Sequence, residues 1–173
     1  MMHVDFALKY ASVHWAVLPV HTVEKGKCSC RFNNCKSPGK HPRISGGVHQ
    51  ASADSDVIKK WWADWPDANI AIATGKRSGL IVLDIDTRHG GLESLEKLQE
   101  RFKELPSSLK VKTGSGGLHY YFRYPDTKDK DSYNVPNKQK LIDLPGLDIR
   151  ADNGYVLAPP SHHISGEVYK WIN

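Results

Sequence analysis

Two aspartates stand at the end of an apolar run in the middle of the chain. The stretch "LIVLDIDTRHGG", residues 80–91, is typical of a buried strand, yet it carries Asp84 and Asp86. Alternate side chains of a strand point to the same side, so the two carboxylates share a face. Two carboxylates removed from water repel each other, and positive charge between them offsets that cost. A divalent metal ion is the natural candidate, although acidic residues at strand ends also cap turns.

Two later segments place further polar residues by the same alternation. In "LHYYFRY" (118–124) His119 faces away from the apolar side chains, as do Asp148 and Arg150 in "LDIR" (147–150). Singly, these residues have structural explanations, as a hydrogen-bonded histidine or a surface salt bridge. If all three strands belong to one sheet whose apolar face lies on helices, five side chains converge on its open face, namely Asp84, Asp86, His119, Asp148 and Arg150. Such a set could hold two divalent metal ions and a polyphosphate.

A glycine-rich turn leads into the histidine of this set. The turn is "TGSGG", residues 113–117, and it lacks the pattern of a Walker A loop. Backbone amides of a glycine-rich turn can nevertheless approach phosphate oxygens closely. We therefore expect Ser115, Gly116 and Gly117 to contribute to phosphate binding beside His119.

All the cysteines lie in one short segment. The stretch "CSCRFNNCKSPGKH" has the spacing C-x-C-x4-C-x5-H and offers four ligands, Cys28, Cys30, Cys35 and His41. The surrounding residues 21–50 have neither a helical nor a strand period, so a bound ion would help to order them. We predict a structural zinc ion in a closed tetrahedral shell, remote from the chemistry, in preference to free thiols.

The rest of the pattern predicts the elements that position these residues. We expect a mixed α/β fold, with a polar, mobile loop at 126–140. Tryptophans in the second helix are expected in the core rather than on a base-stacking surface. The expected helices lie within 4–12, 52–66 and 90–105. The expected strands lie at 14–20, 69–75 and 79–86, within a hairpin at 108–125, and on both sides of a turn at 152–154.

Composition limits the class of protein. The chain has 173 residues, of which 39% are hydrophobic, enough for one main domain over 1–173 with an embedded zinc-binding segment at 21–50. No stretch reaches the roughly 18 apolar residues of a membrane span, and three clustered cysteines fit poorly with a secreted disulfide framework. A cytoplasmic protein is expected. The net charge of +5 suits a polyanionic partner.

Several ordered motifs resemble one known family. The stretches "LIVLDIDTRHGG", "TGSGGLHYYF" and "GLDIRADNGYVLAPPS" are similar to the three motifs of the bifunctional primase-polymerase (Prim-Pol) family, in the archaeo-eukaryotic primase superfamily. Upstream, "ALKYASVHWAVLPV", "GKHPR" and "NIAIATG" match the family pattern in order, so the resemblance covers nearly the whole chain. The second motif is often S-x-H in this superfamily, whereas Gly117 stands at the serine position here, two residues after Ser115.

The resemblance implies a fold, a set of residue roles and partners. It implies a two-lobed α/β domain whose catalytic sheet resembles an RNA-recognition motif and carries a small zinc-binding loop. Asp84 and Asp86 would be first-motif ligands of Mg²⁺ or Mn²⁺, His119 would contact the nucleotide triphosphate, and Asp148 would be the third-motif carboxylate. The partners would be a single-stranded DNA template, a primer and a (d)NTP. Such domains often precede a helicase in plasmid or phage replication proteins, so the chain is expected to be an excised domain.

The leading hypothesis is a DNA-dependent primase-polymerase that catalyses nucleotidyl transfer, with Arg150 helping to hold the triphosphate. Two rivals use the same residues differently. A metal-dependent nuclease could use the same carboxylates, and triphosphate-dependent strand growth would distinguish it. A non-catalytic zinc-dependent DNA-binding module should keep its DNA affinity when Asp84 and Asp86 are changed, and it should show no turnover.

Overall fold

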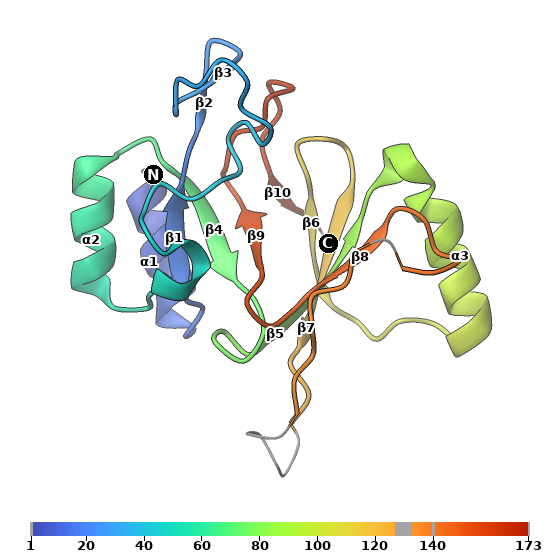
Figure 1. Cartoon of the computed structure of the whole chain (residues 1–173). Coiled ribbons are helices and arrows are strands. Elements are labelled where there is room, and N and C mark those ends of the chain that lie inside the picture. Colours follow the sequence, from blue (N-terminus) through green and yellow to red (C-terminus); the bar gives the residue numbers. More distant parts are fainter. Residues whose placement is uncertain (1, 127–132, 140, 173) are drawn as a thin grey trace.

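Two β-sheets stand side by side, each with helices on its outer side (Figure 1). The structure is a computed structural model that describes residues 2–126, 133–139 and 141–172. Helices α1 (His3–Ser12) and α2 (Ser55–Asp64) belong to one half, and α3 (Gly91–Phe102) belongs to the other. The expected mixed α/β class is confirmed.

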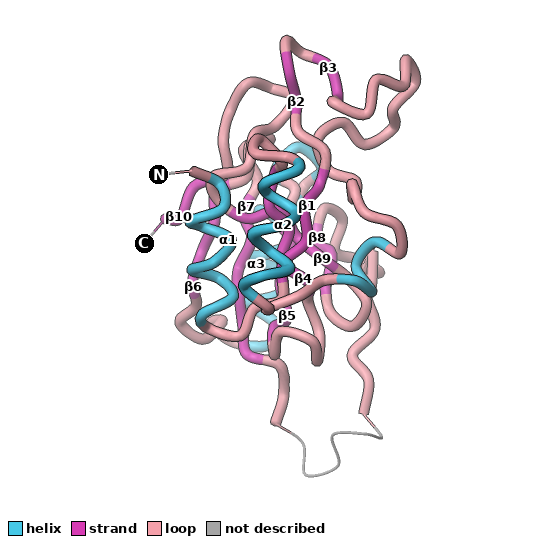
Figure 2. The backbone as a smooth tube through the Cα atoms, turned by 90° about the vertical axis from the view of Figure 1, so that its left-hand side faces the viewer, coloured by secondary structure: helices cyan, strands magenta, loops and turns pink. Residues whose placement is uncertain are grey.

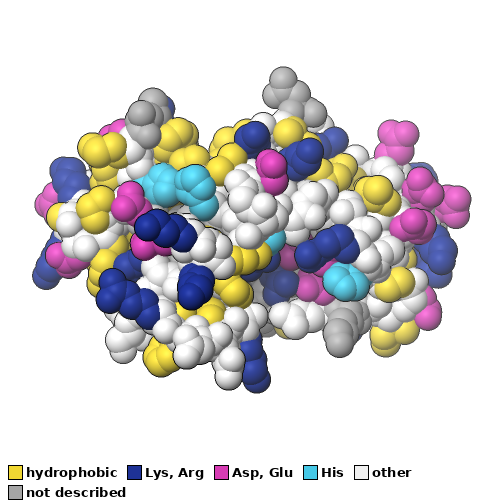
Figure 3. Space-filling model, turned by 90° about the horizontal axis from the view of Figure 1, so that it is seen from above, with side chains coloured by type: hydrophobic (Ala, Val, Ile, Leu, Met, Phe, Trp, Pro, Cys, Tyr) yellow, Lys and Arg dark blue, Asp and Glu magenta, His cyan; other side chains and the backbone are white. Residues whose placement is uncertain are grey.

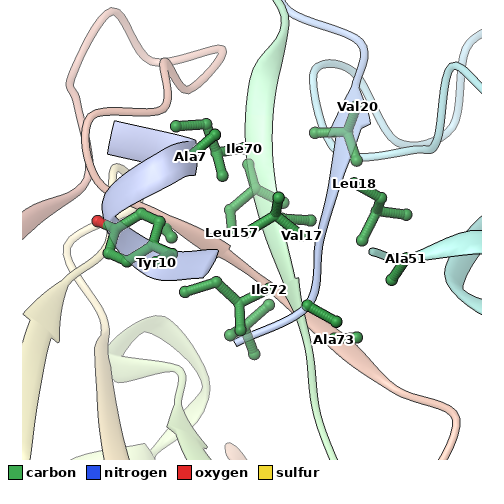
Figure 4. Packing of buried hydrophobic residues seen from close by; sticks show 14 of the residues in the cluster. Ala7, Tyr10, Val17, Leu18, Val20, Ala51, Ile70, Ile72, Ala73 and Leu157 are labelled. Atoms are coloured by element: carbon green, nitrogen blue, oxygen red, sulfur yellow. The ribbon is translucent and has the colours of Figure 1, made fainter. Parts of the chain in front are cut away.

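The first half is built on a three-stranded antiparallel sheet. Its strands lie in the order β1 (Val17–Val20), β4 (Asn69–Ala73) and β9 (Tyr155–Ala158). All residues of β1 and β4 are buried, because α1 and α2 cover the sheet. Side chains of the helix and of the strands meet in a continuous apolar core (Figure 4).

Helix α2 confirms two of the local expectations. Asp54 caps its start, since the carboxylate accepts hydrogen bonds from the backbone N–H groups of Asp56 and Val57. Trp62 is only 3% exposed and belongs to the core, with Trp61 and Trp65 packed against it. The tryptophans therefore stabilise the fold rather than forming an exposed stacking surface.

The second half is a five-stranded antiparallel sheet. Its order is β10 (Lys170–Ile172), β6 (Leu109–Lys112), β7 (Leu118–Arg123), β5 (Leu80–Ile85) and β8 (Leu147–Arg150). Helix α3 packs against the face that carries Leu83, Ile85 and Leu147, and these residues form a second apolar cluster with Leu95 of the helix. The apolar strand faces are therefore those that the alternation predicts. Strand β10, which the sequence pattern does not reveal, closes one edge.

The opposite face of this sheet is only partly open, which corrects the expectation of an open polar face. Val82, Val111 and Tyr121 on that face are at most 4% exposed and belong to the apolar core of the first half. The first half therefore covers much of the face, and the polar residues lie in a cleft between the halves. Alternation indicates which side chains share a face, but it does not show what covers that face.

Shorter elements complete the chain. A two-stranded ribbon, β2 (Val23–Glu24) and β3 (Lys27–Cys28), extends from one end of the molecule (Figure 2). The turns η1 (Gly47–Gln50) and η2 (Thr87–His89) are 3₁₀ helices. Within the described residues, no helix is both long and apolar enough to cross a membrane.

The segment expected to be a mobile loop is partly attached to the sheet. Residues 127–132 and 140 lie outside the described residues, but 133–139 run along the edge of β8. Lys138 and Ile149 exchange backbone hydrogen bonds of 2.9 and 2.7 Å, and Asn137 accepts a hydrogen bond from the Ala151 N–H at 2.6 Å. These residues form no helix or strand, as expected of a loop, but backbone pairing to β8 attaches them to the sheet in place of hydrophobic burial.

Candidate active site

The sheet register places three polar side chains in one row. Asp84 on β5 is directly opposite His119 on β7 and directly opposite Asp148 on β8. Directly paired residues of antiparallel strands project from the same face, so Asp84 lies between the other two. The three strands are neighbours, as a shared site requires.

This row lies in a pocket with a cavity volume of about 970 Å³. Both halves of the molecule contribute to its wall, since Tyr155 and Val156 of β9 line it together with residues of the five-stranded sheet. Viewed from above, acidic and basic side chains lie next to one another between the two halves (Figure 3). The charged residues that line the pocket are Lys40, Asp84, Asp86, Arg88, Asp143, Asp148 and Arg150. Such a pocket suits a ligand that combines negative charge with bound cations.

Arg150 connects two of the carboxylates. Its Nη2 atom lies 2.7 Å from Asp148 Oδ2 and 3.3 Å from Asp84 Oδ2. Burial raises the pKa of Asp84. The hydrogen bond and charge of His119, together with Arg150, lower it by more than burial raises it, so the net pKa is below the usual value. Asp84 is therefore held as a carboxylate in a largely buried position.

Asp86 has a different environment from Asp84. It follows the last residue of β5 and caps η2, accepting a hydrogen bond from the Arg88 N–H at 3.0 Å. The Arg88 guanidinium donates to both carboxylate oxygens, and His89 Nδ1 lies 2.9 Å from Oδ2. These contacts, led by the side chain of Arg88, hold the pKa of Asp86 well below its usual range. The turn-capping alternative is thus correct for the local role of Asp86, although its side chain also lines the pocket.

The chain itself supplies positive charge beside these carboxylates. Guanidinium groups stand against Asp84, Asp86 and Asp148, where the sequence alone suggested a metal ion. Among the described residues, the three do not form a group whose ligand atoms all lie within 4.8 Å of one another. Their oxygen donors have the chemistry that Mg²⁺ and Mn²⁺ prefer, and they share one cavity. The donor set therefore fits a hard divalent cation, which would compete with Arg150 and Arg88.

His119 is almost entirely buried. Its side chain is 6% exposed, and Nε2 lies 3.5 Å from Asp84 Oδ1. The rings of Tyr169 and Tyr121 lie 5.9 and 6.3 Å from the imidazole, which restricts its orientation. Tyr169 also lines the pocket, a position for which the sequence offered no signal. The Nε2 edge of His119 is directed toward Asp84.

The glycine-rich turn contributes less than expected. Thr113 and Ser115 line the pocket, and their hydroxyl oxygens lie 3.0 Å apart. The N–H of Gly116 donates to the Thr113 carbonyl within the turn, so it is not directed at a ligand. Gly116 and Gly117 are not among the residues that form the pocket wall. The structure thus brings Ser115 of this group to the site.

Gly117 has a packing role that explains the departure from S-x-H. A Cβ atom at this position would lie 2.5 Å from the backbone oxygen of Ile85, the residue after Asp84. We predict that Gly117→Ser lowers the free energy of unfolding by roughly 1–3 kcal/mol, because strand β5 must shift. Chemical denaturation would measure this, with Ser115→Ala, which loses one hydroxyl contact, as the milder control. A Gly117→Ser protein of unchanged stability would contradict the prediction.

The four predicted zinc ligands come together. The ligand atoms of Cys28, Cys30, Cys35 and His41 all lie within 4.8 Å of one another, and the group could hold a zinc ion. His41 Nε2 lies 3.4 Å from Cys28 Sγ and 3.5 Å from Cys35 Sγ. The three cysteines are free thiols, and a hydrogen bond from the Phe32 backbone lowers the pKa of Cys30, which favours the thiolate that zinc binds. The donor set fits a tetrahedral Cys3His site.

The predicted remoteness of this group from the chemistry is wrong. His41 and its neighbour Lys40 both line the pocket that contains Asp84. Burial lowers the pKa of Lys40 while the Asp84 charge raises it, with Arg88 and Asp86 also acting on it. The sequence contained no signal that this loop folds back over the sheet.

Comparison with known proteins identifies the family of the chain. The family described as bifunctional DNA primase/polymerase, N-terminal (Prim-Pol), matches residues 7–173. A search of curated proteins finds no match. The match includes β5, β7 and β8, and hence Asp84, His119 and Asp148. With a match over essentially its whole length, the chain belongs to the Prim-Pol family of bifunctional DNA primases and polymerases.

Proposed function

We propose that this chain is a DNA-dependent primase-polymerase domain. It transfers nucleotides from (d)NTPs to a primer or an initiating nucleotide on a single-stranded DNA template. The observation that carries the proposal is the register that aligns His119, Asp84 and Asp148 across three adjacent strands, at the wall of a pocket rich in both charges. A nucleotide triphosphate and its cations need both acidic and basic side chains, because the phosphates bind arginine and the cations bind carboxylates.

Each polar residue has a role in this proposal. Bound to Asp84, Asp86 and Asp148, two Mg²⁺ or Mn²⁺ ions would activate the 3′-hydroxyl and stabilise the departing pyrophosphate. Arg150 already reaches the oxygens of two carboxylates, and the same planar guanidinium suits phosphate oxygens. His119 Nε2 lies 3.5 Å from Asp84 Oδ1, so the imidazole would orient this carboxylate and offer the same nitrogen to the triphosphate. Ser115, on the pocket wall, offers a hydroxyl to the same ligand.

The partners follow from the chemistry. The net charge of +5 favours association with a DNA template and primer. We place the activity in the replication of a plasmid, a phage or another mobile element, with a helicase as the partner that opens duplex DNA. This role implies a cytoplasmic location, where template and nucleotides are found.

A single assay tests the proposal. Purified protein is incubated with a single-stranded DNA template and labelled nucleotides, with and without a primer, in Mg²⁺ or Mn²⁺. Triphosphate-dependent growth of the product supports the proposal, and products formed without a primer indicate initiation. Shortening of the labelled strand without added triphosphate would indicate a nuclease. DNA binding without either reaction would indicate a binding module and would overturn the proposal.

Loss of the histidine is expected to affect nucleotide binding. His119→Ala should raise the apparent KM for nucleotide as well as lower the rate, because the residue contacts the triphosphate in the ground state. Steady-state incorporation over a nucleotide concentration series measures both values. His162→Ala, which changes a histidine outside the pocket wall, serves as the control. A reduced rate with an unchanged KM would show that His119 acts only on Asp84.

A further inference from the structure

Three consecutive residues connect the Cys3His group to the active-site pocket. Gly39 donates its N–H toward Cys28 Sγ at 3.4 Å, and His41 directs Nε2 at the cysteine sulfurs. Lys40 stands between them and lines the pocket with Asp84, Asp86 and Arg150. The backbone on both sides of Lys40 is therefore tied to the group that could hold zinc.

The same three residues are tied to the core of the first half. Tyr155 of β9 donates its hydroxyl to the Lys40 carbonyl at 3.0 Å, and Asn69 of β4 donates to the Gly39 carbonyl at 3.0 Å. Gly39 has a φ of +71°, and a Cβ atom there would lie 2.7 Å from Val23 Cγ2. The segment therefore has little freedom when its ends are held, and the start of the Lys40 side chain is fixed at the pocket.

The charges of the pocket give Lys40 a ligand of defined chemistry. Asp84 and Asp86 already have Arg150 and Arg88 as cation partners at 3.3 and 3.0 Å. Metal ions bound to these carboxylates would displace Arg88 and Arg150 from them. Together with Lys40, the two guanidinium groups would then form a wall of cations. A triphosphate has more oxygens and more negative charge than a monophosphate, so it can contact all three cations along its length.

We propose that Lys40 binds the triphosphate of the incoming nucleotide and that zinc binding by the Cys3His group sets its position. This inference rests on the proposed function, because it takes a nucleoside triphosphate as the ligand. The zinc ion acts here through the backbone, since it joins the segments of Cys28, Cys30 and Cys35 to His41, the residue after Lys40. Lys40 is then a residue that binds the triphosphate, and the Cys3His group positions it.

The test measures binding without turnover. The dissociation constants of a dNTP and of the matching dNMP are measured by calorimetry in Mg²⁺ without DNA. Lys40→Met should weaken dNTP binding about tenfold or more, leave dNMP binding unchanged and retain wild-type zinc content. Lys40→Arg should restore most of the affinity. Lys27→Met is the matched control, because Lys27 is exposed, adjoins the ligand Cys28 and is absent from the pocket wall.

The coupling to zinc is tested by combining the variant with zinc removal. Dialysis against a chelator, followed by return to Mg²⁺, should weaken dNTP binding by the wild-type protein to a similar extent. The same treatment should weaken binding by Lys40→Met about twofold or less, since the two changes remove one contact. The coupling would be overturned if the losses of dNTP affinity from zinc removal and from Lys40→Met multiplied. It would also be overturned if the zinc-free wild-type protein bound dNTP with unchanged affinity. Full affinity of Lys40→Met would overturn the binding role, whereas no dNTP binding by the wild type would instead contradict the proposed function.

Discussion

Replacing Asp84 by Asn is expected to reduce nucleotide incorporation by a factor on the order of a thousand or more. Asp84 occupies the centre of the row, between His119 and Asp148, and its pKa is below the usual value, so it is ionised at neutral pH. In the proposed function, its negative charge would hold the cations that stabilise charge developing during transfer. The amide has nearly the same shape but no charge, so the loss should fall mainly on the chemical step.

The fold should survive this substitution. Arg150 keeps its 2.7 Å contact with Asp148, so removing the Asp84 charge does not leave the guanidinium without a partner. Single-turnover incorporation, template affinity and the thermal midpoint should be measured together. Asp64→Asn, at the exposed end of α2, is the control and should behave like the wild type. An Asp84→Asn protein with wild-type activity would show that the carboxylates of β5 serve only the local structure.

Loss of zinc is expected to have the largest effect on stability. Purified protein should contain about one zinc per chain, and Cys28→Ser should contain almost none. Structural zinc contributes roughly 10–16 kcal/mol of apparent binding free energy in small zinc-finger peptides. The outer part of the segment has few other sources of order, since β2 and β3 have only two residues each and residues 31–34 are all exposed. Without zinc we expect this outer part to open while the apolar core of the first half stays folded.

Limited proteolysis combined with metal analysis measures this effect. Cys28→Ser or chelated protein should be cut within 25–36, where lysine and arginine side chains are exposed, many times faster than zinc-loaded protein. Asn33→Ala, an exposed change between two of the ligands, should keep both zinc and resistance. Zinc-free protein with full resistance would contradict a structural role for the ion.

The sequence by itself determined which side chains share a face. Because strand side chains alternate, it placed Asp84, His119 and Asp148 opposite the apolar residues that pack on α3. It also determined the cap of α2 and the ligands of the Cys3His group, since these depend on neighbours close in the chain. The motifs around these residues were sufficient to indicate the family, which the match over residues 7–173 confirms.

The tertiary structure decided what faces these side chains. Val82 and Tyr121 lie on the polar face of the sheet, and the first half buries them, which leaves a cleft instead of an open surface. Asp86 leaves the strand and pairs with Arg88, a local turn that strict alternation does not predict. Strand β10 and Tyr169 come from the far end of the chain to close one edge and line the site.

The position of Lys40 shows most clearly why the sequence pattern could not predict the whole pocket wall. Lys40 and Asp84 are far apart in the sequence, and no periodicity links a loop to a strand across such a separation. Their shared pocket depends on Asn69 and Tyr155 holding the loop from β4 and β9, contacts that form only when the first sheet is assembled. Local spacing determines the faces and ligand groups, whereas long-range packing determines which of them meet.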